Sequence, residues 1–271
     1  MEPLRVILGS SGLIGSAWKR LYPNSVLVDR SAIGKWFSNK SRISFLNFLE
    51  NLSTDKEIEI HFCFGDTNPT KDLNYLMDLN CNLPLAIAKE ALGRNYRIIT
   101  YGSALEIFGI RNNYFDSKRA FLGKIAKLDT KNLWINVNLH TLYGDSYPHS
   151  HMFLGQIYTS LRDKTPFHMS SGKQLRELHH VDDDVLIIEA ALRKGTIKQI
   201  GISHGKPLQL NEVADYLFNS FGLHELLRKN VLPDNPYDNY SKIFAASPNL
   251  DVISHRDPLK SIKDIFAKLL R

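Results

Sequence analysis

The chain has 271 residues, of which 43% are hydrophobic and 23% charged, and this composition is typical of a globular α/β protein with a large core rather than of a disordered chain. The formal net charge is +6, but the lysines and arginines are scattered and not interleaved with aromatic residues, so we expect no nucleic-acid partner. Two cysteines allow neither a disulfide framework nor a zinc-ligand pattern, and no segment resembles a signal peptide or the roughly eighteen apolar residues of a membrane span, so we expect a cytoplasmic protein.

Short β-type runs alternate with helical patterns through the first half of the chain. The runs span residues 4–8, 25–29, 57–64, 96–101 and 133–139, and apolar residues recur every three to four positions over 72–92 and 114–128. Strands that alternate with helices predict right-handed crossovers and a parallel sheet covered on both faces. The sequence therefore predicts a doubly wound α/β sheet, the Rossmann fold.

The pattern changes after about residue 145, where histidine, proline and asparagine become more frequent. Short strands are expected at 166–169 and 198–203, and helices near 182–193, 210–220 and 257–270. We expect a dinucleotide-binding domain over 1–145, to which the chain can return later, and a smaller, mainly substrate-binding lobe over 146–271. Ligands of open α/β sheets bind at the carboxyl ends of the strands, so a cleft between these parts is the expected site.

A glycine-rich turn, GSSGLIG, follows the first run and opens a helical pattern. Gly9, Gly12 and Gly15 have the GxxGxxG spacing, and a Cβ at these positions would obstruct the sharp turn, the approach of a pyrophosphate, or helix–strand packing. The helix N-terminus offers free N–H groups to phosphates. We place the dinucleotide on Gly9, Ser11, Gly12, Leu13, Ile14 and Gly15, with Phe64 at the end of the third run.

The end of the second run bears on the choice between the two nicotinamide dinucleotides. Asp29, twenty positions after Gly9, would accept hydrogen bonds from the adenosine ribose, which favours NAD. Arg30 beside it would pair with the 2′-phosphate of NADP. The cofactor is therefore NAD or NADP, with NAD slightly favoured.

The stretch from Tyr101 to Lys118 leaves the strand over 96–101 and enters a helix. Ser103 falls at the carboxyl edge of the predicted sheet, beside a nucleotide held by the glycine turn. Tyr114 and Lys118 are four positions apart and so share one helix face. Alone such a pair is an ordinary surface contact, but in this context it becomes a candidate reaction centre.

In these motifs the chain resembles the extended short-chain dehydrogenase/reductases, specifically the nucleotide-sugar epimerases, dehydratases and reductases. The resemblance covers most of the chain, and its elements occur in the family's order. They are the GxxGxxG turn, Asn80, Ser103, the YxxxK pair at 114 and 118, LYG at 142–144 and QLRELHHVDD at 174–183.

The resemblance implies a role for each of four residues. Tyr114 would be the catalytic acid/base, Lys118 would hold the nicotinamide ribose and lower the pKa of the tyrosine, and Ser103 would hydrogen-bond the reacting oxygen. Arg176 would clamp the nucleotide diphosphate, a task that suits a guanidinium. Lowering the pKa of a phenol from about 10 to about 7 requires about 4 kcal/mol, which the ammonium and an oxidised nicotinamide would supply together.

Three departures from the family bear on the substrate. Only eleven positions separate Ser103 from Tyr114, and Asn113 stands where relatives end a longer loop with proline. Dehydratases carry an adjacent Asp-Glu pair after the catalytic threonine, whereas this chain has Glu106 alone, which disfavours dehydration. Asn138 and Thr141 replace the arginine and asparagine of the family's RxxNxYG element.

Two adjacent histidines and three aspartates in RELHHVDDDV invite a metal assignment. Consecutive residues rarely converge on one ion, and Asp182 is well placed to cap the following helix. We therefore interpret His180 and Asp182 as structural and expect no metal.

Taken with the resemblance, the sequence predicts an NAD(P)-dependent reductase of a keto group, at C4, of a nucleotide-linked sugar in polysaccharide or O-antigen assembly. A nucleotide-sugar 4-epimerase with tightly bound NAD is the alternative. A non-catalytic dinucleotide- or RNA-binding member of the fold is a further one, which the retained Ser, Tyr and Lys disfavour. The resemblance also implies a homodimer.

Overall fold

The computed structural model describes residues 2–35, 39–52, 55–129, 131–195, 198–247 and 255–271. Its contacts divide the chain into two compact units. Unit 1 comprises Met1–Glu106, Arg111–Asn138 and Ala191–Ile200, and unit 2 comprises Ile107–Ile110, Leu139–Ala190 and Gly201–Arg271. The assignment of the later part of the chain to substrate binding stays a prediction.

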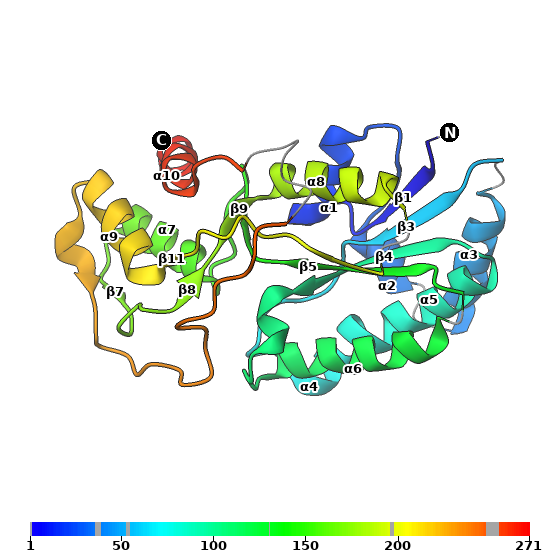
Figure 1. Cartoon of the computed structure of the whole chain (residues 1–271), viewed down its shortest axis with the longest axis horizontal. Helices are drawn as coiled ribbons and strands as arrows, with labels where there is room; N and C mark the ends of the chain where they lie inside the picture. Colours follow the sequence, from blue (N-terminus) through cyan, green and yellow to red (C-terminus); the bar gives the residue numbers. More distant parts are fainter. Residues whose placement is uncertain (1, 36–38, 53–54, 130, 196–197, 248–254) are drawn as a thin grey trace. The chain divides into compact units, whose positions relative to one another are not determined.

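Unit 1 is built on a six-stranded sheet in the order β10-β5-β4-β3-β1-β2 (Figure 1). The strands are β1 (Leu4–Leu8), β2 (Val26–Val28), β3 (Ile58–Phe62), β4 (Arg97–Ser103), β5 (Trp134–Leu139) and β10 (Gln199–Gly201). β1 pairs in parallel with β2 and with β3, and β3 pairs in parallel with β4. The predicted parallel α/β sheet is therefore confirmed, with the carboxyl ends of β1 and β4 at the same edge.

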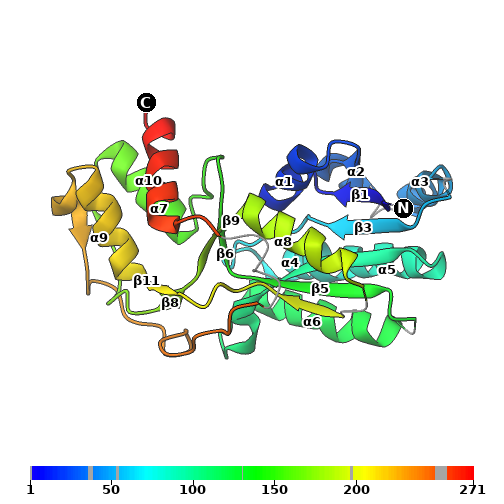
Figure 2. The ribbon, with the colours of Figure 1, turned by 45° about the horizontal axis from the view of Figure 1, so that its top comes forward.

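Helices lie on both faces of this sheet. They are α1 (Leu13–Leu21), α2 (Arg30–Lys35), α3 (Asn39–Glu50), α4 (Leu73–Met77), α5 (Leu83–Gly93) and α6 (Asn113–Leu128). α4, α5 and α6 lie on the face opposite to α1 in both views (Figures 1 and 2). The helix expected over 72–92 is interrupted by one π turn, Asp78–Asn82, a local irregularity that apolar spacing does not reveal.

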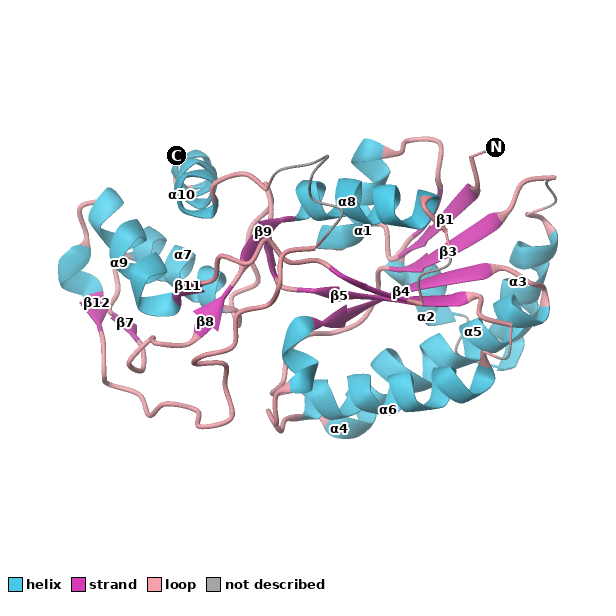
Figure 3. Cartoon of the chain, in the orientation of Figure 1, coloured by secondary structure: helices cyan, strands magenta, loops and turns pink. Residues whose placement is uncertain are grey.

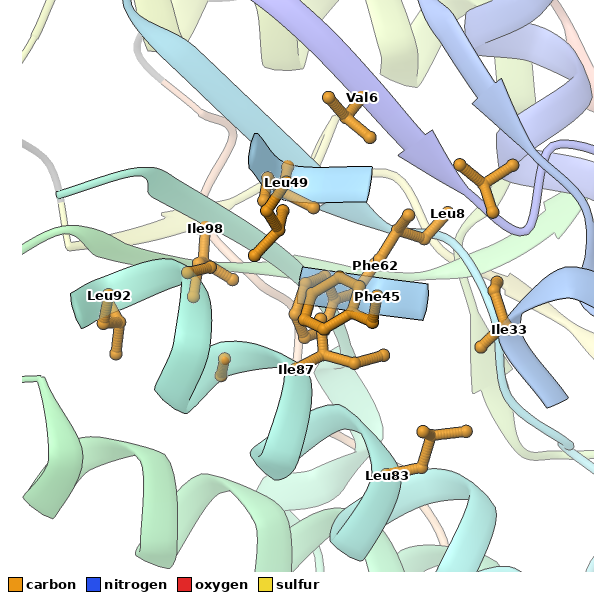
Figure 4. Packing of buried hydrophobic residues seen from close by; sticks show 14 of the residues in the cluster. Val6, Leu8, Ile33, Phe45, Leu49, Phe62, Leu83, Ile87, Leu92 and Ile98 are labelled. Carbon is orange, nitrogen blue, oxygen red and sulfur yellow. The ribbon is translucent and has the colours of Figure 1, made fainter. Parts of the chain in front are cut away.

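The core of unit 1 explains why its strands read as continuous apolar runs. Val6, Ile7 and Leu8 of β1 are completely buried, as expected for a strand covered on both faces. Figure 4 shows Ile87 and Leu92 of α5 packed with the buried side chains of neighbouring elements. Burial of each large apolar side chain stabilises the fold by about 1.5–3 kcal/mol.

Unit 2 combines helices with short strand pairs (Figure 3). Its elements are β6 (Thr141–Tyr143), α7 (Phe153–Asp163), β7 (Phe167–His168), β8 (Leu175–Arg176), β9 (Leu178–His180), α8 (Val181–Arg193, whose end belongs to unit 1), β11 (Leu208–Gln209), α9 (Leu210–Ser220), β12 (Leu227–Arg228) and α10 (Pro258–Leu269). A second apolar core joins α7, α9 and α10. Among the helices that the structure describes, none is both long and apolar enough to cross a membrane.

The prediction that Asp182 caps the helix after β9 is wrong. α8 already begins at Val181, so Asp182 lies in its first turn. The backbone N–H of Asp182 donates to Nδ1 of His180 at 3.2 Å, so the histidine side chain performs the capping. Asp182 instead places a negative charge at the positive end of the helix dipole.

Candidate active site

The glycine turn between β1 and α1 is fixed by the backbone itself. Gly9 has φ +88°, and a Cβ there would lie 2.7 Å from the carbonyl oxygen of Cys63. A Cβ at Gly15 would lie 2.2 Å from the carbonyl oxygen of Gly9. These two glycines are therefore required by the fold, whether or not a ligand binds.

Gly12 is different, and it shows that the turn fits a dinucleotide. A Cβ at Gly12 would make only ordinary contacts, at 3.4 Å and more, with the carbonyl oxygens of Cys63 and Gly9. Gly12 precedes α1, and in the structure as described this helix has no side-chain cap and no acidic residue in its first turn. Its free N–H groups are thus available to a phosphate, and a Cβ at position 12 would fill the space over the turn.

The two residues that bear on cofactor choice already have protein partners. Oδ1 of Asp29 accepts hydrogen bonds from the Ser31 hydroxyl and the Ala32 N–H, both at 2.8 Å, and so caps the start of α2. Arg30 is 57% exposed, and its Nη2 donates to the Tyr75 hydroxyl at 3.1 Å.

At the carboxyl end of β4, Ser103 and Glu106 form a tight turn. The Ser103 N–H donates to Oε1 of Glu106 at 2.8 Å, and the Ser103 hydroxyl oxygen accepts from the Leu105 N–H at 3.2 Å. Glu106 thus closes the short loop locally. The Ser103 hydroxyl retains its proton for another acceptor.

α6 carries Tyr114 and Lys118 toward the same strand. Nζ of Lys118 donates to the carbonyl oxygen of Tyr101 in β4 at 2.7 Å. Burial, and then the charge of Glu106, raise the pKa of Tyr114. Burial lowers the pKa of Lys118, and Glu106 opposes that change. The structure therefore brings Ser103, Tyr114 and Lys118 together around one carboxylate.

Local contacts explain how α6 starts without the proline of its relatives. The Asn112 side chain accepts the Phe115 N–H at 2.9 Å and caps the helix, while the Asn113 amide donates to the carbonyl oxygen of Lys71 at 3.0 Å. In this chain the Asn112 cap ends the loop before α6, whereas the relatives end the corresponding loop with a proline, whose φ is fixed.

Asn80, which the sequence named only as part of a pattern, holds α6 in place. Its Oδ1 accepts the Asp66 N–H at 2.9 Å, and its Nδ2 donates to the carbonyl oxygen of Asp66 at 2.9 Å and to Oγ of Ser117 at 3.1 Å. Ser117 is completely buried and lies between Tyr114 and Lys118 in the helix. Asn80 lies in the π turn, so its hydrogen bond to Ser117 ties this turn to α6 next to Tyr114 and Lys118.

Sequence reasoning missed a buried polar cluster beneath this face. The Tyr101 hydroxyl accepts from Nε1 of Trp18 at 2.7 Å and lies 2.8 Å from Nδ1 of His61. Since the Tyr101 carbonyl holds Lys118, this cluster fixes the strand that orients the lysine. Apolar runs gave no signal for it beyond the isolated histidine at 61.

Arg176 belongs to unit 2, whereas Ser103, Tyr114 and Lys118 belong to unit 1. Its Nη1 and Nη2 each lie 2.8 Å from an oxygen of Asp238, so the two residues form a bidentate ion pair. The side chain of Arg176 is 13% exposed and that of Asp238 is 11% exposed. This is the geometry in which a guanidinium grips an anionic group with two oxygens. In this structure the anionic group bound by Arg176 is the carboxylate of Asp238.

No model of a known protein family matches the chain, and no curated protein sequence matches it. Solved structures do match over nearly the whole length. The UDP-glucose 4-epimerase of Thermotoga maritima with UDP-glucose is similar with a TM-score of 0.78 and 13% identity, over 98% of this chain and 99% of that one. The dTDP-glucose 4,6-dehydratase of Bacillus anthracis with NAD has a TM-score of 0.74 at 13% identity, over 98% and 97%. The dTDP-4-dehydrorhamnose reductase of the same organism with NADP has 0.73 at 15%, over 98% and 99%.

These likenesses agree with the resemblance that the motifs indicated, and at 13–15% identity they establish the fold. The chain has the Rossmann-type fold of the nucleotide-sugar epimerases, dehydratases and reductases among the extended short-chain dehydrogenase/reductases.

Proposed function

We propose that the chain is an NAD(P)-dependent oxidoreductase of the short-chain dehydrogenase/reductase type that reduces a keto group, at C4, of a nucleotide-linked sugar. The observation that carries the proposal is the position of Ser103, Tyr114 and Lys118 at the end of β4, on the same sheet edge as the glycine turn after β1. In parallel sheets this edge is where dinucleotides bind.

The cofactor, when bound, would supply the hydride to the carbonyl carbon. Tyr114 donates the proton of its phenol to the oxygen that develops negative charge, and the Ser103 hydroxyl donates a hydrogen bond to the same oxygen. Lys118 is anchored on the Tyr101 carbonyl at 2.7 Å, and its remaining N–H donors would hold the ribose of the cofactor.

The electrostatics set a condition on this mechanism. Within the protein alone, burial and Glu106 raise the pKa of Tyr114, which suits a proton donor and opposes its use as a base. The phenol therefore acts readily as the acid of a reduction. The reverse direction needs a positive charge beside the phenol, which the oxidised nicotinamide would provide.

A 4-epimerase is the second candidate, supported by the likeness to the UDP-glucose 4-epimerase. An epimerase uses Tyr114 in both directions and keeps its cofactor bound. Glu106 does not favour dehydration, because its carboxylate is engaged with the Ser103 N–H. A role in polysaccharide or O-antigen assembly and a homodimeric state belong to the same proposal.

The test is turnover with NADH and with NADPH on a panel of nucleotide 4-keto sugars, with the protein also assayed for copurified NAD. Tyr114→Phe should lower kcat by about 10²–10⁴-fold, because general acid catalysis is lost. Tyr147→Phe, at a tyrosine that is 66% exposed in unit 2, is the matched control. Full turnover by Tyr114→Phe would overturn the proposal, and tightly bound NAD with no net cofactor consumption would favour the epimerase.

A further inference from the structure

Unit 2 contains a buried cluster of imidazoles and carboxylates outside the proposed reaction centre. The members come from β9, α8, the single residues between β5 and β6 and between β8 and β9, the loop after β10 and the residues before α10. They are His140, Glu177, His179, Asp184, His204 and His255.

Three of these residues converge most closely. Nδ1 of His179 and Nε2 of His255 each lie 2.9 Å from the same oxygen, Oδ1 of Asp184. The two rings are 4.2 Å apart between centroids. The side chains of His179, Asp184 and His255 are 0%, 1% and 5% exposed, so water does not separate them.

The hydrogen bonds of this group are incomplete. Oδ2 of Asp184 and Nδ1 of His255 are buried without a hydrogen-bond partner among the described residues. A buried carboxylate oxygen without a partner costs free energy, and such an atom calls for an explanation such as a bound ion. The oxygen belongs to the residue on which both rings converge.

A second carboxylate supports His179 from the other side. Oε2 of Glu177 lies 3.1 Å from Nε2 of His179. Glu177 is itself fixed, because it accepts from the Ser203 hydroxyl at 2.7 Å and from the His204 N–H at 2.8 Å. A ring nitrogen bound to a carboxylate while the other faces an ion is the usual arrangement around a metal-binding histidine.

We propose that His179, Asp184 and His255 bind a divalent transition-metal ion, with zinc as the first candidate. One oxygen and two imidazole nitrogens, all within 4.8 Å of one another, are donors that zinc accepts, and Oδ2 of the same Asp184 carboxylate has no other partner among the described residues. Tetrahedral ligands at about 2.0–2.1 Å from zinc are about 3.3 Å apart, so the two N···O distances of 2.9 Å need to lengthen by only a few tenths of an ångström. Each ring would bind the ion through the nitrogen that faces Asp184, and a proton on that nitrogen would pass to solvent from an imidazolium or move to the other ring nitrogen of a neutral imidazole.

The neighbouring donor groups fit less well. In the group of Glu177, His179 and His204, Nδ1 of His204 already accepts the Lys206 N–H at 3.1 Å. In the group of Asp145, His180 and Asp182, both aspartates are 3.9 Å from the ring and Asp145 is 63% exposed. The ion would therefore bind at His255 and tie β9, α8 and the residues before α10 together within unit 2.

The experiment uses the whole chain, without a histidine tag and stripped of metal by a chelator. Zinc is titrated in competition with a chromogenic chelator, and cobalt(II) is titrated with its visible spectrum recorded. We expect one zinc per chain and the absorption of a tetrahedral cobalt site. His255→Gln should weaken zinc binding by about 100-fold or more, and Glu177→Gln by about 10–100-fold.

The control is the double variant His149→Gln/His151→Gln, which removes a second pair of neighbouring histidines in unit 2 with rings 5.5 Å apart. It should keep the affinity and the cobalt spectrum. Loss of binding in this variant would assign the ion to that pair. If the wild-type chain binds no zinc, or if His255→Gln binds zinc equally well, the proposed metal site is wrong and the cluster is held together by hydrogen bonds only. If His255→Gln fails to fold, the wild-type cobalt spectrum and Glu177→Gln decide the question.

Discussion

The two units both bury carboxylates, but they neutralise them with different cations. In unit 1, Glu59 is 2% exposed and lies 2.8 Å from Nη1 of Arg97 and 3.9 Å from Nε of Arg5. In unit 2, Glu177 and Asp184 are each 1% exposed and face imidazoles. A guanidinium stays charged and does not bind metals, whereas an imidazole exchanges its proton for other protons or for an ion.

The carboxyl groups respond alike, although their partners differ. Burial acts to raise the pKa of Glu59, but hydrogen bonds and charges from His61 and Arg97 outweigh it and hold the pKa below its usual value. Burial likewise opposes the change at Glu177, yet His179 and His140 contribute to lowering its pKa to about 2. The comparison teaches that Glu59 in unit 1 keeps two permanently charged guanidinium groups beside it in addition to His61, while the charge balance of Glu177 and Asp184 in unit 2 depends on what their histidines hold.

The largest effect on stability should come from Glu59→Gln. It removes a buried counter-charge from Arg5, and breaking a buried ion pair costs about 3–5 kcal/mol. The measurement is urea unfolding followed by tryptophan fluorescence, because Trp18 and Trp134 lie in unit 1. Glu57→Gln is the matched control, since Glu57 pairs with the same Arg97 at 3.0 Å but is 53% exposed, so its loss should stay below about 1 kcal/mol. Equal losses in the two variants would contradict the role of burial.

The pH dependence of this difference should have a definite sign. The pKa of Glu59 is lower in the folded chain than its ordinary value of 4.5, so its contribution is complete above pH 4.5 and is lost as the pH falls through the folded value. The gap between wild type and Glu59→Gln should therefore stay constant from pH 5 to 8 and close only in stronger acid. A gap that closes near pH 6.5 would assign the contribution to His61 instead.

These contrasts also show what the sequence could predict. The strands β1 to β5 and helix α6 follow from apolar periodicity and the glycine turn, which are local properties. The pairing of Asp184 with His255, 71 positions away, and of Arg176 with Asp238, 62 away, depends on tertiary contacts that no local pattern encodes. The expectation of no metal rested on neighbours in the sequence, whereas the cluster draws its members from separate elements.

The next effect, in unit 2, follows from the proposed metal site. Zinc at about 100 times its Kd should stabilise unit 2 by about 2.7 kcal/mol. Hydrogen exchange measured by mass spectrometry should slow in peptides from β9, α8 and α10, while the tryptophan transition of unit 1 stays unchanged. The response should vanish in His255→Gln. Slower hydrogen exchange in unit 1 alone would contradict a metal site in unit 2.

Glu106 is a partly buried carboxylate, and its effect on catalysis should be smaller. It accepts the Ser103 N–H, and its charge adds to burial in raising the pKa of Tyr114. Glu106→Gln keeps the hydrogen-bond acceptor and removes the charge, so the pKa of Tyr114 should fall. In the alcohol-oxidising direction, which needs the phenolate, the acidic limb of the kcat/KM profile should move to lower pH. The control Glu57→Gln should not move the acidic limb of the kcat/KM profile. If Glu106→Gln does not move it either, the charge of Glu106 does not influence the pKa of Tyr114.

Substitution of Arg30 should have the smallest effect, because Arg30 is exposed, whereas the arginines that pair with Glu59 are buried or partly buried. It is 57% exposed and lies 4.0 Å from Asp66, so Arg30→Ala should change stability by less than about 1 kcal/mol. If its guanidinium pairs with a 2′-phosphate, kcat/KM for NADPH should fall by about 10-fold while that for NADH stays constant. Lys19→Ala, at an exposed cation of α1, should change neither value. Because Asp29 is already committed to capping α2, an unchanged NADPH value would leave the choice of cofactor to contacts other than this pair.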